Sequence, residues 1–169
     1  MLLKVDIDGH DCLVTEAILE AKFSPALVLM EINARFPPPL KFSLIFEESY
    51  ESEDRTFLYG CSLSYASEMM CKRGYRLVQL TYIDALFIRD DIAEVHGISI
   101  NSCGREDDVW THGYWNAHNR DYCFPWNRNL QHWNEPPGLS DTSKLQRVLQ
   151  SIMDDKKIRE NIPPFVLYL

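Results

Sequence analysis

The feature that most constrains this chain is a pair of short apolar runs, each of which leads directly into acidic or amide side chains. Residues 2–7 precede Asp8, and residues 26–30 precede Glu31 and Asn33. Residues 2–7 are mostly apolar, with Lys4 and Asp6 as exceptions, and indicate a buried strand, whereas residues 26–30 form an unbroken apolar run that is typical of a strand buried on both faces, as in a parallel sheet. We therefore expect two buried strands whose ends carry polar groups.

The rest of the first hundred residues continues this alternation of strand and helix. Apolar residues at helical spacing over 13–21 predict one helix between the two strands. A second helix is predicted to begin after Ser62 and to end before Gly74, which suits the left-handed residue beyond a helix. Residues 75–82 and 85–89 indicate two more strands, and the short link between them requires an antiparallel hairpin.

This alternation predicts an α/β fold, with helices on a mainly parallel sheet whose last strand is antiparallel. Residues 37–54, which begin with three prolines and become acidic, are expected to form a surface loop. Near the other end of the chain, one helix is predicted over 141–154, and residues 165–169 are either a strand or a docked tail.

Composition changes near residue 100, so we divide the chain into a first domain, 1–99, and a Trp-rich extension, 100–169. All four Trp residues lie within 110–133. We expect them to anchor an irregular segment to the core, with stacking on a sugar or a base as the alternative. His112 and His118 have a spacing found in zinc sites, but the Cys spacings match no standard site, so loop histidines without metal are expected there.

Composition and charge argue against several classes of protein. The 169 residues suit one domain, and 46% hydrophobic with 25% charged residues is ordinary globular composition. A net charge of −8 argues against a nucleic-acid binder. No apolar run approaches the roughly 18 residues that span a bilayer, so no membrane partner is expected. The five cysteines, with irregular spacing and no secretory signal, predict free thiols and a cytoplasmic location.

The polar residues that follow the two apolar runs form the candidate site. Ligands of an open α/β sheet bind beyond the carboxyl ends of its parallel strands, so these side chains should meet at one edge. The group comprises Asp6, Asp8, Gly9, His10, Asp11, Glu31, Asn33 and Arg35. Its carboxylates could bind a divalent cation, hold a substrate group or take up a proton. The plainer alternatives are that Asp8-Gly9 is only a turn and that Asp11 only caps the next helix.

Residues 5–9 also resemble the motif of haloacid-dehalogenase phosphatases, in which Asp6 would be the nucleophile and Asp8 the acid and base. In that family, Thr or Val normally follows two residues after the second Asp, where this chain has His10. The chain has no convincing later Lys and acidic pair to complete the motif.

Longer segments resemble the FkbM-like, S-adenosylmethionine-dependent methyltransferases. Residues 3–11, LKVDIDGHD, resemble the family signature at the fourth strand of the sheet and the turn after it. Residues 25–33 are similar to the fifth strand with its E-x-N ending. Three further segments resemble the lead into the next helix, the sixth strand and the seventh strand, namely 59–63, 72–78 and 84–89, the last with Asp84 in place of Asn. Together these motifs cover residues 2–92.

The resemblance implies the C-terminal half of a class I methyltransferase domain, a Rossmann-like sheet with strands in the order 4-5-7-6. It implies S-adenosylmethionine as cofactor, a small-molecule or sugar acceptor, and methyl transfer to oxygen. Some class I enzymes bind Mg²⁺ through carboxylates at this edge, so a metal-assisted version stays open. The implied roles are catalysis by Asp8 and Glu31, cofactor binding by Asp6 and Gly9, and acceptor binding by Asp6, His10, Asn33 and Arg35.

The first three strands of such a domain, with their Gly-rich turn, have no counterpart here, because no Gly-x-Gly occurs. We therefore expect the isolated chain to be an inactive derivative, or a non-catalytic binding module in which residues 100–169 replace the other half. The strand over 2–7 would then be an apolar sheet edge, through which the chain would self-associate unless the tail covers it.

Overall fold

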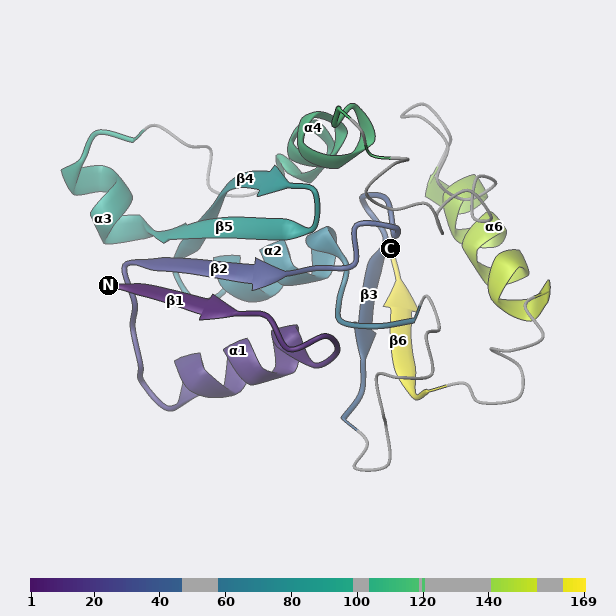
Figure 1. Ribbon diagram of the computed structural model, residues 1–169, viewed down its shortest axis with the longest axis horizontal. Coiled ribbons are helices and arrows are strands. Elements are labelled where there is room, and N and C mark those ends of the chain that lie inside the picture. Colours follow the sequence, from purple (N-terminus) through teal and green to yellow (C-terminus); the bar gives the residue numbers. More distant parts are fainter. Residues whose placement is uncertain (47–57, 99–103, 119, 121–140, 155–162) are drawn as a thin grey trace.

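The computed structural model describes residues 1–46, 58–98, 104–118, 120, 141–154 and 163–169. Its main sheet has four strands (Figure 1). Their order across the sheet is β1 (Leu2–Val5), β2 (Leu27–Glu31), β5 (Asp84–Arg89) and β4 (Tyr75–Thr81). β1 and β2 are parallel, whereas β5 is antiparallel to both β2 and β4. The mixed α/β class, the order of these strands and the hairpin are therefore confirmed.

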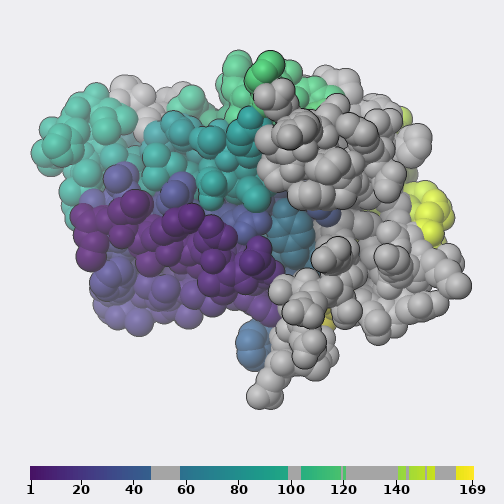
Figure 2. Space-filling model, viewed as in Figure 1, coloured from purple at the N-terminus to yellow at the C-terminus, as the bar shows by residue number. Residues whose placement is uncertain are grey.

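The two apolar runs have different environments. In β2, Val28 and Met30 are fully buried, as predicted for a strand covered on both faces. β1 lies at the edge of the sheet and, among the described residues, pairs only with β2. Its Val5 is buried, but Leu2 is 53% exposed, and Figure 2 shows this N-terminal segment (purple) on the surface. The strand predicted over 2–7 is confirmed at residues 2–5, and among the described residues it lies at the sheet edge, as expected where the first three strands of the domain have no counterpart.

Two helices pack on this sheet close to the strand ends. α1 (Asp11–Glu20) contacts β1 and β2, and α2 (Leu63–Cys71) contacts β4. The predicted start of α2 is confirmed, because the Ser62 hydroxyl accepts a hydrogen bond from the Tyr65 N–H at 3.2 Å. The predicted left-handed residue after α2 is confirmed as well, with Gly74 at φ +76°.

A second sheet stands beyond the carboxyl ends of β1 and β2 and crosswise to them (Figure 1). It pairs β3 (Lys41–Leu44) with β6 (Phe165–Tyr168) in antiparallel register, and α6 (Asp141–Asp154) packs on it. The prediction of a loop over 37–54 is wrong at 41–44, because Phe42 and Leu44 are buried in this second core. The predicted helix over 141–154 is confirmed, and so is the strand alternative for the tail.

Three short helical segments were not predicted: α3 (Asp90–Val95), α4 (Glu106–Trp110) and the π-helix η2 (Thr111–Trp115). Trp110 is buried in the main core, and its indole N–H donates to the Ala34 carbonyl at 2.7 Å, so this Trp does anchor its segment.

Gly113 passes so close to β4 that a Cβ would lie 2.0 Å from the Leu80 carbonyl oxygen. Each of the two hydrophobic cores therefore contains residues from both sides of residue 100, where the composition changes. Trp126 and Trp133 lie outside the described residues.

The cysteines differ from expectation. Cys12, in the first turn of α1, is disulfide-bonded to Cys61, which precedes α2, and Cys71 is disulfide-bonded as well. The prediction of free thiols is therefore wrong for these residues. The irregular spacing in the chain gave no sign of a pairing that only the packing of α1 against the lead into α2 creates. None of the helices in the described part of the chain is long and apolar enough to cross a membrane.

Candidate functional site

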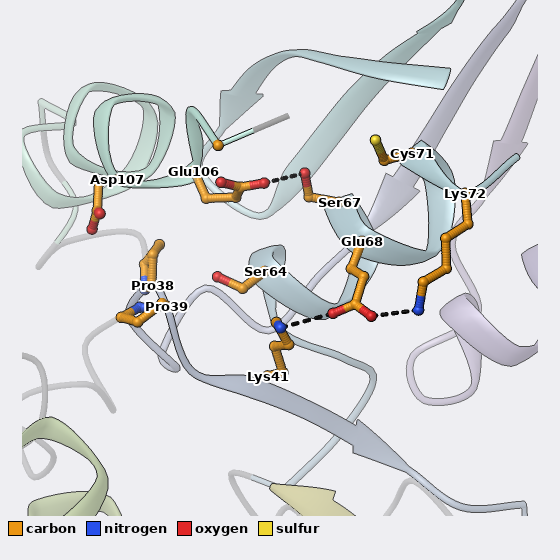
Figure 3. A pocket seen from close by; sticks show the side chains of 11 residues that line it. Pro38, Pro39, Lys41, Ser64, Ser67, Glu68, Cys71, Lys72, Glu106 and Asp107 are labelled. Atoms are coloured by element: carbon orange, nitrogen blue, oxygen red, sulfur yellow. Dashed lines mark hydrogen bonds and ion pairs between the residues drawn. The ribbon is translucent and has the colours of Figure 1, made fainter. Parts of the chain in front are cut away.

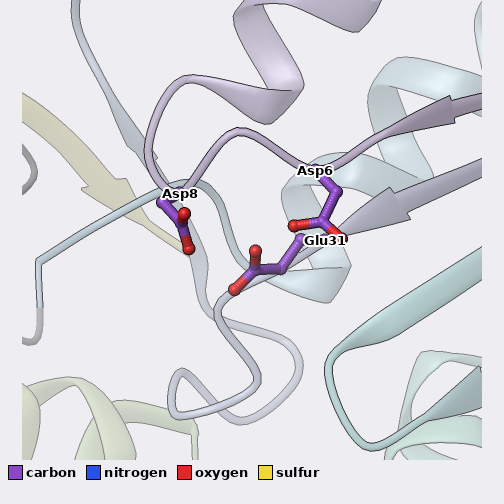
Figure 4. Close-up of side chains that lie close together, drawn as sticks. All are labelled: Asp6, Asp8 and Glu31. Atoms are coloured by element: carbon purple, nitrogen blue, oxygen red, sulfur yellow. The ribbon is translucent and has the colours of Figure 1, made fainter.

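Three carboxyl groups meet beyond the carboxyl ends of β1 and β2 (Figure 4). Asp6 and Asp8 follow β1, and Glu31 is the last residue of β2. One carboxylate oxygen from each lies within 4.8 Å of the others. Asp6 and Asp8 are exposed, whereas Glu31 is only 8% exposed. The predicted convergence of the two strand ends is confirmed, while the roles of these residues stay predictions.

Glu31 is the unusual acid of this group. Burial raises its pKa to about 8, and the negative charges of Asp11, Asp6 and Asp8 act in the same direction. A buried carboxyl group surrounded by other carboxylates favours its neutral form, because its charged form loses hydration and gains repulsion. Near neutral pH, Glu31 can therefore both hold and accept a proton.

Asp6 shifts in the opposite direction. Its hydrogen bond and ion pair with Lys4, with 2.9 Å between Nζ and Oδ2, lower the pKa of Asp6, and a hydrogen bond with Glu31 acts in the same direction. Both partners of the ion pair are about half exposed, so it adds little to stability. The pair of acids thus has a defined state, in which Glu31 carries the proton and Asp6 the charge.

The turn that carries Asp8 is built by Asp11. The buried Asp11 carboxylate accepts hydrogen bonds from the Ile7 N–H at 2.9 Å and the Gly9 N–H at 3.1 Å. The prediction that Asp11 caps α1 is wrong, because the cap position is His10, without a side-chain hydrogen bond to the helix. The carboxylate reaches back to the preceding turn instead. Within that turn Asp8 has a φ of +55°, a left-handed conformation that Asp tolerates better than most residues.

The other predicted residues of this loop lie deeper. Gly9 is buried, and its N–H is occupied by Asp11. His10 is half-buried, with its ring centre 5.6 Å from that of Phe46. Cofactor binding by Gly9 and acceptor binding by His10 both stay predictions.

Asn33 braces the end of β2 against the segment before α2. It is fully buried, its side-chain amide donates to the Tyr59 carbonyl at 3.0 Å, and its oxygen accepts from the Arg35 N–H at 3.3 Å. Its backbone N–H also donates to the Cys61 carbonyl at 2.7 Å. Asn33 was predicted to bind the acceptor, and the structure places it beneath the surface, where it positions its neighbours.

Tyr59 is a site residue that sequence reasoning missed. The guanidinium carbon of Arg35, a predicted acceptor-binding residue, lies 5.4 Å from the centre of the Tyr59 ring. Negative charge on Glu31 helps to raise the pKa of the Tyr59 hydroxyl, with burial as the main cause. The segment 59–63 did stand out in the sequence, but only as the lead into a helix.

The carboxylates of Asp6, Asp8 and Glu31 fit both Mg²⁺ and S-adenosylmethionine, the two ligands that the resemblance implies. Three carboxylate oxygens at short mutual distance suit a hard cation such as Mg²⁺. The same negative charges suit the sulfonium and ammonium groups of S-adenosylmethionine. Asp6 and Asp8, the two exposed acids, are the residues that would face either group.

A separate cavity of about 440 Å³ lies between α2, β3 and α4 (Figure 3). Its charged side chains largely bind one another: Glu68 pairs with Lys41, at 2.8 Å, and with Lys72, while Glu106 accepts from the Ser67 hydroxyl. The charge of Glu68 is thus compensated within the chain, in contrast to the acidic group at the strand ends.

Comparisons with protein-family models, with curated proteins and with solved structures find no match.

Proposed function

We propose that the chain carries the acceptor-binding side of an FkbM-like, S-adenosylmethionine-dependent O-methyltransferase. The observation that carries this proposal is the buried Glu31 carboxyl, with a pKa raised to about 8 beside Asp6 and Asp8. A base with a pKa near the working pH is best suited to remove a proton from an acceptor hydroxyl. The sheet order β1-β2-β5-β4, with β5 antiparallel, supports the proposal because it is the order that the sequence resemblance implies.

Each acid has its own task in this proposal. In the molecules in which Glu31 is ionised, its carboxylate accepts the proton of the acceptor hydroxyl, and Asp8 orients that hydroxyl from the exposed turn. Asp6 keeps its negative charge through Lys4 and would hold the cationic end of the cofactor. When bound, S-adenosylmethionine supplies a methyl group on a sulfonium, so the protein contributes alignment and proton removal.

The test is methyl transfer from labelled S-adenosylmethionine to a panel of monosaccharides and small hydroxylated acids, with acceptor binding measured in parallel. We expect the wild type to bind an acceptor, and we expect any methyl transfer it performs to fall at least 100-fold in Glu31→Gln and to stay unchanged in Glu68→Gln, at a carboxyl outside the site. Acceptor binding without transfer would identify a non-catalytic binding module. Absence of both binding and transfer would contradict the proposal.

The convergence of three carboxylates also favours a second candidate, a Mg²⁺-dependent phosphatase of the haloacid-dehalogenase type with Asp6 as nucleophile and Asp8 as acid and base. The ion pair between Asp6 and Lys4 argues against it, since it occupies the nucleophile. Hydrolysis of a phosphomonoester that requires Mg²⁺ and is lost in Asp6→Asn would favour the phosphatase over the methyltransferase.

We also propose that the chain works in an oxidising compartment rather than in the cytoplasm. Disulfides persist where thiols are oxidised and are rare in the cytosol, and Cys12, Cys61 and Cys71 are all disulfide-bonded. A small-molecule or sugar acceptor remains the proposed partner, since the acidic site and the net charge of −8 would repel nucleic acid.

A further inference from the structure

Two hydrogen-bond donors lie side by side just beyond β2 and bind no acceptor in the described part of the chain. They are the guanidinium of Arg35 and the hydroxyl of Tyr59, with 5.4 Å between the guanidinium carbon and the ring centre. Other arginines of the structure do bind carboxylates: Arg73 pairs with Glu16 at 2.6 Å and with Glu20 at 3.0 Å. The chain has 25 acidic residues, yet within the described ranges none forms an ion pair with Arg35.

Both donors are partly removed from water. Burial lowers the pKa of Arg35 and raises the pKa of the Tyr59 hydroxyl. A guanidinium nevertheless stays charged in proteins, and a phenol with a raised pKa stays protonated, so both remain donors around neutral pH. A half-buried cation without a counterion is unfavourable, and an anion from outside the chain would offset that cost.

The two donors are held in place before any ligand arrives. Asn33 bonds to the backbone of both residues, at the Arg35 N–H and the Tyr59 carbonyl. The buried Tyr114 lies within electrostatic reach of Arg35, and the guanidinium carbon of Arg120 lies 5.8 Å from its ring centre. Asn33 thus fixes the backbone from which both donors extend, and the Tyr59 hydroxyl lies within electrostatic reach of Glu31.

We propose that Arg35 and Tyr59 bind the carboxylate of a small hydroxylated acceptor, such as a uronic acid, whose hydroxyl faces Glu31. This rests on the proposed function of Glu31 and adds the class of acceptor. The planar fork of a guanidinium matches a carboxylate, and the phenol supplies a further donor. A single negative charge is favoured over a phosphate dianion, because Asp6 and Asp8 at the same edge repel additional charge.

The test titrates D-glucuronate, D-glucose and S-adenosylmethionine separately into the full chain, followed by chemical shifts or by the thermal unfolding temperature. We expect glucuronate to bind the wild type and to bind Arg35→Gln at least tenfold more weakly, as the loss of a hydrogen bond to a charged group implies. Tyr59→Phe should weaken glucuronate binding several-fold. Arg35→Lys, which keeps the charge but loses the fork, should restore only part of the affinity.

Arg73→Gln is the matched control. It should lower the unfolding temperature, because Glu16 and Glu20 lose their partner, but leave glucuronate affinity unchanged. Arg35→Gln should unfold at about the same temperature as the wild type, since the cation it removes has no counterion among the described residues and only the Tyr59 ring beside it. This readout separates a binding defect from a folding defect.

Equal affinity of the wild type and Arg35→Gln for glucuronate would overturn the proposal. So would binding of S-adenosylmethionine alone that depends on Arg35, because the carboxylate would then belong to the methionine end of the cofactor. Arg35-dependent glucuronate binding without methyl transfer would support the carboxylate site and contradict only the methyltransferase assignment.

Discussion

Glu31 and Glu68 are the same residue type in two regions with opposite electrostatics. Glu31, at the strand ends, is buried among acids, and its pKa is raised to about 8. Glu68, on α2, lies between Lys41 and Lys72, and their hydrogen bonds lower its pKa. The lysines beside α2 compensate the charge of Glu68, whereas the region at the strand ends keeps acids together and leaves Arg35 without a counterion among the described residues. Keeping like charges together lowers the free energy of unfolding, and we interpret this loss of stability as a sign of a functional site.

The largest effect should come from replacing the titratable carboxyl of Glu31 by an amide. Its pKa is about 8 in the folded chain against an ordinary value of 4.5, so the folded state binds the proton more tightly than the unfolded state. The stability of the wild type relative to Glu31→Gln should therefore fall as pH rises from about 4.5 to about 8, in total on the order of 4 kcal/mol. Urea unfolding across this pH range measures it.

Glu68→Gln is the control for this comparison. Since the pKa of Glu68 is lowered, its contribution is present at neutral pH and is lost as pH falls through its folded-state pKa. An exposed ion-pair network of this kind contributes at most about 1 kcal/mol and weakens with salt. If both variants showed the same pH dependence, the contrast between the two regions would be wrong.

The next largest effect concerns the disulfide that joins the two regions, from Cys12 in α1 to Cys61 before α2. Replacing both cysteines by Ser should lower the free energy of unfolding by about 3 kcal/mol, chiefly because the unfolded chain gains freedom. Unfolding of this variant is compared with that of the wild type in oxidised form. If the wild type without reductant gave two free thiols at these positions by mass spectrometry, the proposed oxidising compartment would lose its support.

A smaller loss of stability is expected when the turn before α1 loses the hydrogen bonds that Asp11 accepts. Asp11→Ala removes a buried carboxylate that accepts from the Ile7 and Gly9 N–H groups, and should lower the free energy of unfolding by about 2 kcal/mol. Ser62→Ala, which removes the cap of α2, is the counterpart in the other region, with an expected loss of about 1 kcal/mol. Only Asp11→Ala should also weaken acceptor binding, because Asp8 depends on that turn.

The smallest effect concerns association through β1. Its outer edge is unpaired among the described residues, and Leu2 is 53% exposed. We propose that the chain self-associates weakly along this edge. Light scattering at increasing concentration should show a rising mass for the wild type and a constant mass for Leu2→Lys, whose charge blocks strand pairing. A wild type that stays at 19.7 kDa would contradict this.

Local signals account for the elements that the sequence predicted well. The apolar run of β2, the cap at Ser62 and the helical spacing over 141–154 each depend on neighbours a few residues away. β3 has no such signal, because three prolines precede it and its partner β6 comes from the other end of the chain. Its two buried apolar residues, Phe42 and Leu44, make too short a pattern to predict a strand.

The features of the candidate site also fall into two groups: those that local sequence patterns predict and those that depend on contacts between distant residues. The meeting of Asp6, Asp8 and Glu31 follows from parallel strands, which bring their carboxyl ends to one edge. The task of Asp11 depends on the path of the turn before it, and the pairing of Cys12 with Cys61 depends on how α1 packs. Tyr59 enters the site only through the brace from Asn33, a contact across 26 residues that no local pattern encodes.

The pairing of β3 with β6 has a consequence for how the chain is made. Lys41 lies opposite Tyr168 and Leu44 opposite Phe165, so a strand synthesised early finds its partner only in the last residues described. Until those residues emerge from the ribosome, Phe42 and Leu44 have no second strand beside them, and contacts between such distant segments form slowly. A change that delays or weakens β6 would therefore also leave β3 without its partner.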